Sequence, residues 1–179
     1  IGAEGVSAFT VMNLTNFIGV LLFLGISDGM IPVMGYLFGA QQFGRLKAFF
    51  RFIAKTNFVI GILVFAVLQC FGETIIGLFV KDPHSHTAEI AYKGLHIFSY
   101  VFLINGFNIL VTSFFTSIGN ALGSIVIATL RGVVFIGIGM LILPTFLGER
   151  GIWLTLVLSE VLTLAVSIFL ARRSVVFNE

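Results

Sequence analysis

The chain has 179 residues, of which 58% are hydrophobic and 10% are charged, with a formal net charge of +2 and a mean hydropathy of +1.11. Soluble domains carry roughly 25% charged residues, so this chain has too few polar side chains to cover a globule in water. Because no basic cluster is interleaved with aromatic residues in a polar setting, a nucleic-acid partner is also excluded. The composition predicts an all-α, polytopic bundle of transmembrane helices.

The first predicted helix covers residues 6–38, and Asp28 is the only charged residue within it. At a rise of about 1.5 Å per residue, Asp28 lies well inside the membrane. Gly29 and Pro32 are expected to bend the helix, which a membrane tolerates when neighbours satisfy the freed backbone groups. Five polar side chains fall within an arc of about 120°, which favours a wall facing a cavity, with interhelical hydrogen bonding as the alternative. They are Thr10, Asn13, Asn16, Ser27 and Asp28.

A basic stretch follows and leads into the second predicted helix, residues 46–71. Its members are Arg45, Lys47, Arg51 and Lys55. The clearest loop, residues 81–87, contains His84 and His86. Two histidines in an exposed loop are a weak metal signal, so no metal site is predicted.

The third predicted helix, residues 87–118, carries a second polar stripe before a turn signal at Gly119 and Asn120. The stripe spans an arc of about 80° on an ideal helix. It consists of Asn105, Asn108, Thr112 and Thr116, surrounded by Phe102, Phe107, Phe114 and Phe115. Neutral polar groups with aromatic neighbours suit an amphipathic or cationic organic ligand, and structural packing is the alternative.

The last two predicted helices, residues 123–147 and 151–171, each contain a charge. Glu160 lies about 14 Å into its helix, close to the bilayer midplane. A carboxylate there costs roughly 2.5–3.5 kcal/mol on insertion scales, so it should face protein, water or a cation. It is either a proton, cation or substrate site or a structural partner of Arg131, which is expected to act as a structural charge. Four hydroxyl residues on the fifth helix favour a helix contact seam: Thr155, Ser159, Thr163 and Ser167.

Lys and Arg are most numerous after the first and fifth spans, which predicts that these ends are cytoplasmic. The chain is therefore expected to be multi-pass in the plasma (inner) membrane, with a cytoplasmic C-terminus and Ile1 on the outer side. It begins without an initiator Met and without the pattern of a signal peptide, so we expect it to be a piece of a longer polypeptide. An outside start fits one further helix upstream and a bundle of six.

Several stretches together resemble the second half of a transporter of the multidrug and toxic compound extrusion (MATE) family, of the multidrug-efflux or DNA-damage-inducible branch. They are the glycine-rich stretch Gly25–Gln41 that ends in Gly-Ala before a basic loop, Leu78–Pro83, Thr116–Ala121, Leu130-Arg131, and Gly151–Thr155 followed by Ser159-Glu160. Their order and spacing carry the resemblance, which covers nearly the whole chain.

The resemblance implies two six-helix lobes packed about an axis along the membrane normal. The chain would then be a single transmembrane domain, a partial C-terminal lobe, whose partners are the N-terminal lobe, membrane lipid and small organic substrates. The family's acidic coupling residue in its tenth helix has no counterpart here, where Asn105 and Asn108 stand instead. Coupling is therefore expected in the other lobe, and Asp28 and Glu160 are candidates on physical grounds alone.

The leading functional prediction is an antiporter that exports organic, cationic or amphipathic compounds in exchange for H⁺ or Na⁺ by alternating access. No cofactor besides the coupling ion and no catalytic residue is predicted. A flippase for lipid-linked glycans is the closest alternative. A basic lumen would favour it, because its substrates carry phosphates, and Arg131 is the only cation expected within the membrane. An integral membrane enzyme would need His, Asp or Glu clustered at a membrane face, and a packing subunit without transport would not need the polar stripes.

Overall fold

The computed structural model describes residues 3–78 and 85–178, and within these ranges every regular element is a helix. Five stretches are long and apolar enough to cross a bilayer. They are Asn13–Gly39, Phe43–Gly77, Ala88–Ser117, Ala121–Leu147 and Arg150–Arg173. The predicted all-α bundle of membrane-spanning helices is thereby confirmed.

The first span is divided into α1, Ala3–Gly29, and α2, Ile31–Gly39. The division falls at Met30, and Pro32 occupies the first turn of α2. Proline cannot donate a backbone hydrogen bond and fits best in the first turn of a helix. The bend predicted from glycine and proline therefore lies at this point.

The second span, α3, Phe43–Gly77, is longer than the predicted 46–71. The third span is interrupted, since α4, His86–Phe98, leads through the 3₁₀ turn η1, Ser99–Val101, into α5, Phe102–Ser117. Gln69 of α3 donates from Nε2 to the His96 carbonyl at 3.2 Å and to Ser99 Oγ at 2.9 Å, which supports the interruption. Ser85 caps the start of α4 by accepting from the Ala88 amide.

The fourth span also contains an interruption that the sequence did not predict. It consists of α6, Ala121–Thr129, the π-helical turn η2, Leu130–Val134, and α7, Phe135–Leu147. Gly148, with a positive φ of 56°, turns the chain into α8, Glu149–Arg173, which extends beyond the predicted 151–171. A short helix that was not predicted, α9, Val175–Asn178, follows.

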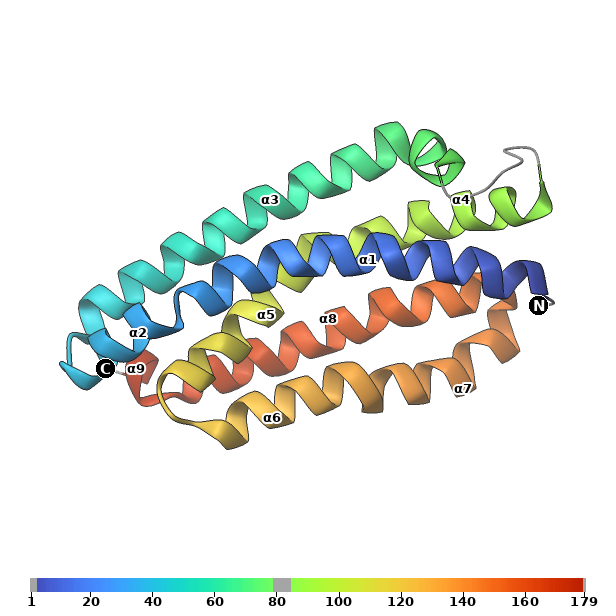
Figure 1. Ribbon diagram of the computed structural model, residues 1–179. Helices are drawn as coiled ribbons and strands as arrows, with labels where there is room; N and C mark the ends of the chain where they lie inside the picture. Colours follow the sequence, from blue (N-terminus) through green and yellow to red (C-terminus); the bar gives the residue numbers. More distant parts are fainter. Residues whose placement is uncertain (1–2, 79–84, 179) are drawn as a thin grey trace.

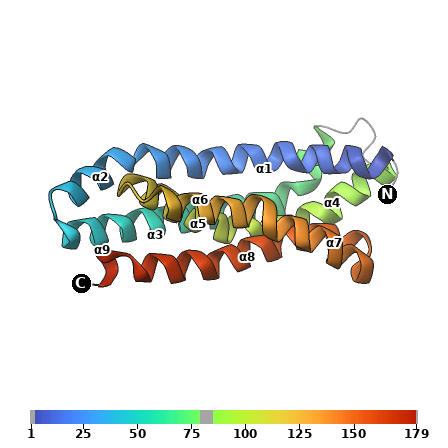
Figure 2. The ribbon, with the colours of Figure 1, turned by 90° about the horizontal axis from the view of Figure 1, so that it is seen from below.

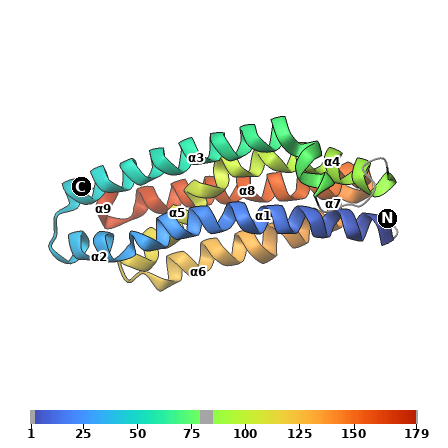
Figure 3. The same ribbon diagram turned by 45° about the horizontal axis from the view of Figure 1, so that its top comes forward.

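The spans lie side by side along one long axis, with the N-terminus at one end and the C-terminus at the other (Figure 1). The central helix is α5, which contacts α1, α3, α6 and α8. Seen from below, α1 and α8 lie on opposite sides of α5 (Figure 2). After a turn of 45° from the view of Figure 1, α3 is seen along the edge of the bundle (Figure 3). The contacts of α7 are mainly with α8.

Buried apolar side chains form two clusters, one including Phe23, Leu95 and Trp153 and the other including Met34 and Phe114. Buried polar side chains lie between members of these clusters along four helices: Ser27 in α1, Asn57 in α3, Asn105 and Asn108 in α5, and Ser159 and Glu160 in α8. The bundle therefore carries a polar layer at mid-depth.

One part of this layer ties three helices together. Asn57 of α3 donates from Nδ2 to Ser27 Oγ of α1 and to the Gly106 carbonyl of α5, both at 2.9 Å. Such interhelical bonds contribute roughly 0.6 kcal/mol each in membranes. The other part of the layer surrounds Glu160.

Candidate functional site

Glu160 of α8 is the most buried charged group of the polar layer, with 8% of its side chain exposed. Its Oε1 accepts from Arg131 Nε at 2.7 Å and from Asn105 Nδ2 at 3.4 Å. Its Oε2 accepts from Asn108 Nδ2 at 2.7 Å. A carboxylate inside a membrane is tolerated when it is paired and hydrogen-bonded. Asn105 and Asn108 thus do meet a carboxylate, which comes from α8.

The π-helical turn η2 carries Arg131. Within it the Phe135 amide bonds to the Leu130 carbonyl, five residues back, which widens the helix. Ser159 of α8 donates from Oγ to the Arg131 carbonyl at 3.0 Å. Single π-turns within α-helices occur frequently at functional sites. The position of Arg131 is therefore fixed from both its side chain and its backbone.

A cavity of about 300 Å³, which we call the Glu160 chamber, lies beside this pair. Its polar lining is Asn16 of α1, Asn105 of α5, Arg131 of η2, and Ser159 and Glu160 of α8. Its apolar lining includes Phe98, Val101, Ile136 and Leu156. The breaks in the third and fourth spans border it, η1 through Val101 and η2 through Arg131. Broken membrane helices around a polar cavity are typical of the binding sites of secondary transporters.

Three amide oxygens around the chamber are buried and have no hydrogen-bond partner among the described residues: Oδ1 of Asn16, Asn105 and Asn108. An unsatisfied buried acceptor costs about 1–3 kcal/mol. Such atoms suit water, an ion or a ligand that carries N–H or O–H groups.

The predicted polar stripe of α1 does not act as one wall. Asn16 lines the chamber, whereas Asn13 is exposed and lies outside the chamber lining. Ser27 is buried against Asn57. Asp28 is exposed, and its Oδ1 accepts from Ser113 Oγ of α5 at 2.5 Å. Ser27 and Asp28 therefore take part in interhelical hydrogen bonds, which is the alternative to a cavity wall.

The predicted stripe on the third span is divided in the same way. Asn105 and Asn108 face Glu160, whereas Thr112 and Thr116 each donate to a carbonyl of their own helix at 3.0 Å and do not line the chamber. Of the four phenylalanines expected around a ligand, Phe102, Phe114 and Phe115 are buried in the apolar clusters and Phe107 packs edge-on against Phe50. These aromatic side chains thus pack within the bundle, as the packing alternative predicts, and an aromatic-lined ligand site on this span stays a prediction.

The four hydroxyl residues of α8 are all buried. Thr155 lies against α7, where a Cβ added to Gly139 would be 2.6 Å from its Cγ2. Thr163 donates to the Ser159 carbonyl of its own helix. Ser159 is the member of this seam whose role the sequence did not reveal, because its partner is a backbone carbonyl of η2.

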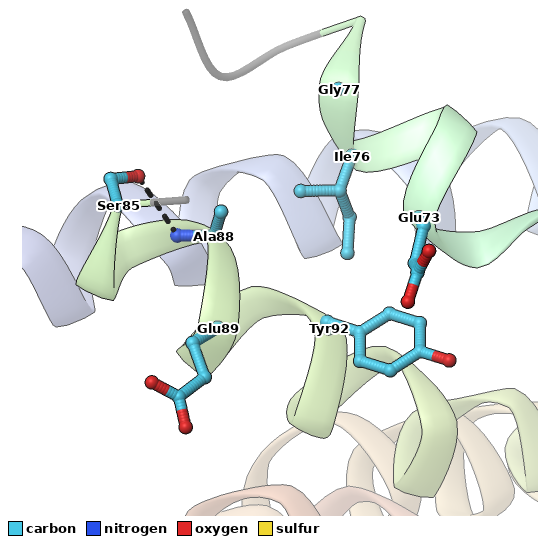
Figure 4. A pocket seen from close by; sticks show the side chains of 7 residues that line it. All are labelled: Glu73, Ile76, Gly77, Ser85, Ala88, Glu89 and Tyr92. Atoms are coloured by element: carbon cyan, nitrogen blue, oxygen red, sulfur yellow. Dashed lines mark hydrogen bonds between the residues drawn. The ribbon is translucent and has the colours of Figure 1, made fainter. Parts of the chain in front are cut away.

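A second cavity, of about 400 Å³, lies between the end of α3 and the start of α4 (Figure 4). Figure 4 shows the carboxylate of Glu73 beside the ring of Tyr92, and that of Glu89 turned away from it. Glu89 pairs with Lys93 at 2.6 Å, and all three charged side chains are exposed. His84 lies outside the described residues, among which no group of three His, Cys, Asp or Glu could hold a metal ion. We assign this cavity no role.

The chain matches one family model and several solved structures of similar fold. A family model described as MatE matches residues 1–143. No curated protein sequence matches the chain.

Three similar solved structures share the fold of the chain at low sequence identity. An outward-facing multidrug resistance MATE family transporter of the MOP superfamily has a TM-score of 0.89 over 96% of the chain at 22% identity. An inward-facing one has a TM-score of 0.85 over 92% at 21% identity. A MOP superfamily transporter from Pyrococcus furiosus, described by the reverse polarity of its binding pocket, has a TM-score of 0.89 over 96% at 20% identity. The chain spans 38% of the length of each.

Proposed function

Since the chain belongs to the MatE family, a family of transporters and not of enzymes, we propose that it is part of a secondary active transporter. This transporter exports small organic compounds, amphipathic or cationic, in exchange for H⁺ or Na⁺ by alternating access. The chain supplies helices of one lobe, and the other lobe completes the pathway. Membrane lipid surrounds both.

The Glu160 chamber is the observation that supports this proposal. Ionisable residues inside a membrane are costly and commonly mark a pathway for ions or substrates. Here Glu160 and Arg131 border a cavity at mid-depth, between two interrupted helices. A subunit with only a packing role would need neither the cavity nor the interruptions.

Glu160 is the candidate for ion coupling in this lobe. A proton or Na⁺ that binds the carboxylate competes with the Arg131 guanidinium, which now holds it at 2.7 Å. Loss of that pair would release η2 from α8, apart from the Ser159 bond to its backbone. An ion can shift a conformational equilibrium only through such a difference in contacts between two states. Asp28, which accepts a hydrogen bond from Ser113, is a second candidate.

The orientation proposed from the sequence agrees with where the basic residues lie. Arg45, Lys47 and Arg51 at the start of α3 lie at the same end of the bundle as Arg172 and Arg173 at the end of α8 (Figure 1). Positive residues concentrate on the cytoplasmic side of membranes. We therefore propose that this end faces the cytoplasm and that the protein resides in the plasma membrane.

Reconstituted vesicles test the proposal on the full-length protein, with rhodamine 123, a fluorescent organic cation, as probe. An imposed H⁺ or Na⁺ gradient is expected to drive dye transport. Glu160→Gln should lower the gradient-driven rate per folded molecule by about tenfold, since coupling between sites is typically of this size. Asp28→Asn is expected to lower it less. Glu89→Gln, at an exposed surface pair, is the control and should transport at the wild-type rate.

Dye movement that does not depend on the H⁺ gradient or on the Na⁺ gradient would contradict the transport proposal itself. Gradient-driven movement at the wild-type rate in both Glu160→Gln and Asp28→Asn would leave transport standing and assign coupling to the other lobe.

A flippase for lipid-linked glycans is the second candidate function, and Arg131 is the observation that favours it. Its guanidinium lines the chamber, where it could meet a phosphate. Transfer of a fluorescent phospholipid-linked sugar between leaflets, without dye export, would support this candidate over the first.

A further inference from the structure

We propose that Arg131 binds the carboxylate of a small zwitterionic solute inside the Glu160 chamber. This assignment names a substrate class and rests on the transport function proposed above. A simple organic cation is the expected substrate from the sequence. Within the described residues, however, the charged side chain of the chamber that keeps unused hydrogen-bond donors is the positively charged Arg131.

The hydrogen-bond donors of Arg131 are only partly used within the described residues. A guanidinium has five N–H groups in a fixed planar fork. Only Nε is used within the described part of the chain, in the 2.7 Å bond to Glu160. The two terminal nitrogens have no hydrogen-bond partner there, although Arg131 lines the chamber and 23% of its side chain is exposed. Two parallel N–H groups in this geometry match the two oxygens of a carboxylate.

The negative charge of Glu160 is already engaged within the protein. Its two oxygens already accept from three nitrogens, those of Arg131, Asn105 and Asn108. Its charge is thus used within the protein, where it orients the guanidinium. Ser159 holds the backbone of Arg131 from the same helix. The fork is therefore positioned before any ligand arrives, which reduces the entropy lost on binding.

Two buried amide oxygens belong to residues that line the same chamber. Oδ1 of Asn105, in a residue that is 1% exposed, and Oδ1 of Asn16 are buried without a partner among the described residues, and both residues line the chamber. These oxygens accept hydrogen bonds and suit a ligand with N–H groups. A solute with N–H donors and a carboxylate would satisfy both kinds of group, and the paired charges Glu160 and Arg131 leave the chamber without net charge to repel it.

Two dyes that differ only at the carboxyl group test the proposal. Rhodamine 110 carries a free carboxylate and N–H donors, and rhodamine 123 is its methyl ester. Binding of each to the purified full-length protein in detergent is measured by fluorescence polarisation, at one pH and salt concentration. The wild-type protein should bind rhodamine 110 about tenfold more tightly than rhodamine 123, as expected for added hydrogen bonds to a charged group.

Two variants show whether Arg131 causes the preference. Arg131→Gln with Glu160→Gln removes both charges together and is expected to bind the two dyes equally, with rhodamine 123 changed by less than about threefold. Arg131→Lys keeps the ion pair but lacks the planar fork, and should lose most of the preference. Glu89→Gln, at an exposed surface pair far from the chamber lining, should keep it.

Each outcome decides the proposal. It is overturned if the wild-type protein fails to bind rhodamine 110, or if the ratio of the two affinities is unchanged in the folded double variant, which would make Arg131 an internal ion pair only. Because binding in detergent needs no gradient, these results are separate from the vesicle experiment. Preserved binding without gradient-driven transport would contradict the transport function alone.

Discussion

Replacing Gly61 by alanine is expected to destabilise the bundle by about 1–3 kcal/mol, the usual cost of overpacking a tight contact. Gly61 of α3 is buried, and a Cβ there would lie 2.4 Å from the Phe102 carbonyl oxygen and 3.3 Å from its carbon. Because both atoms are backbone, no side chain can turn aside to make room. The helices α3 and α5 would have to separate, and the Asn57 bond to Gly106 would lengthen with them.

Gly25→Ala is the matched control, since it is also within a helix but a Cβ there meets nothing within 4 Å. Alanine is favoured over glycine in a helix by about 1 kcal/mol, so this variant should be as stable as the wild type or slightly more stable. Thermal unfolding of the full-length protein in detergent gives both values. Equal midpoints for Gly61→Ala and Gly25→Ala would show that α3 and α5 are not in close contact.

The second large effect concerns the ion pair between Arg131 and Glu160. Removing one member of a buried pair costs about 3–5 kcal/mol because the other charge is left without a partner. Arg131→Gln and Glu160→Gln are each expected to lose an amount near the lower end of this range, since Arg131 is partly exposed. The double variant should be more stable than either, because glutamine keeps an oxygen for the Asn108 amide and no charge remains.

A double-mutant cycle on unfolding in detergent measures this coupling directly. A double variant whose loss equals the two single losses added together would mean that the two side chains do not interact. The cycle also identifies the double variant as a folded protein suitable for the dye-binding experiment.

Apolar stretches with few charges were sufficient to predict roughly where the spans lie, because crossing lipid imposes both length and composition. The turn at Gly119 and Asn120 is present, with Gly119 at a positive φ of 73° and Asn120 accepting from the Gly123 amide. The breaks η1 and η2 were not predictable in this way. They are supported from other helices, by Gln69 and Ser159, and the pattern within one helix carries no information about such partners.

The candidate site was predictable as a set of residues but not as an arrangement. Glu160 and Arg131 can be identified from the sequence because a charged side chain inside an apolar membrane helix has a high free-energy cost. The sequence left open whether they form an ion pair or a site. The structure places the pair in the wall of a cavity. Neighbouring residues on one predicted arc, such as Ser27 and Asp28, have partners on different helices, which the pattern within one helix does not reveal.

A role for the Glu160 chamber in transport requires that it is open to water within the membrane, and thiol labelling of Asn16→Cys tests this most directly. In the full-length protein, with Cys70 and any other native cysteine replaced, a membrane-impermeant methanethiosulfonate reagent should modify Asn16→Cys. Val59→Cys, at an exposed apolar position of α3 outside the chamber lining, is the control and is expected to stay unmodified. Rapid labelling of Asn16→Cys that rhodamine 110 slows is the predicted result. Labelling as slow as that of Val59→Cys would contradict the account.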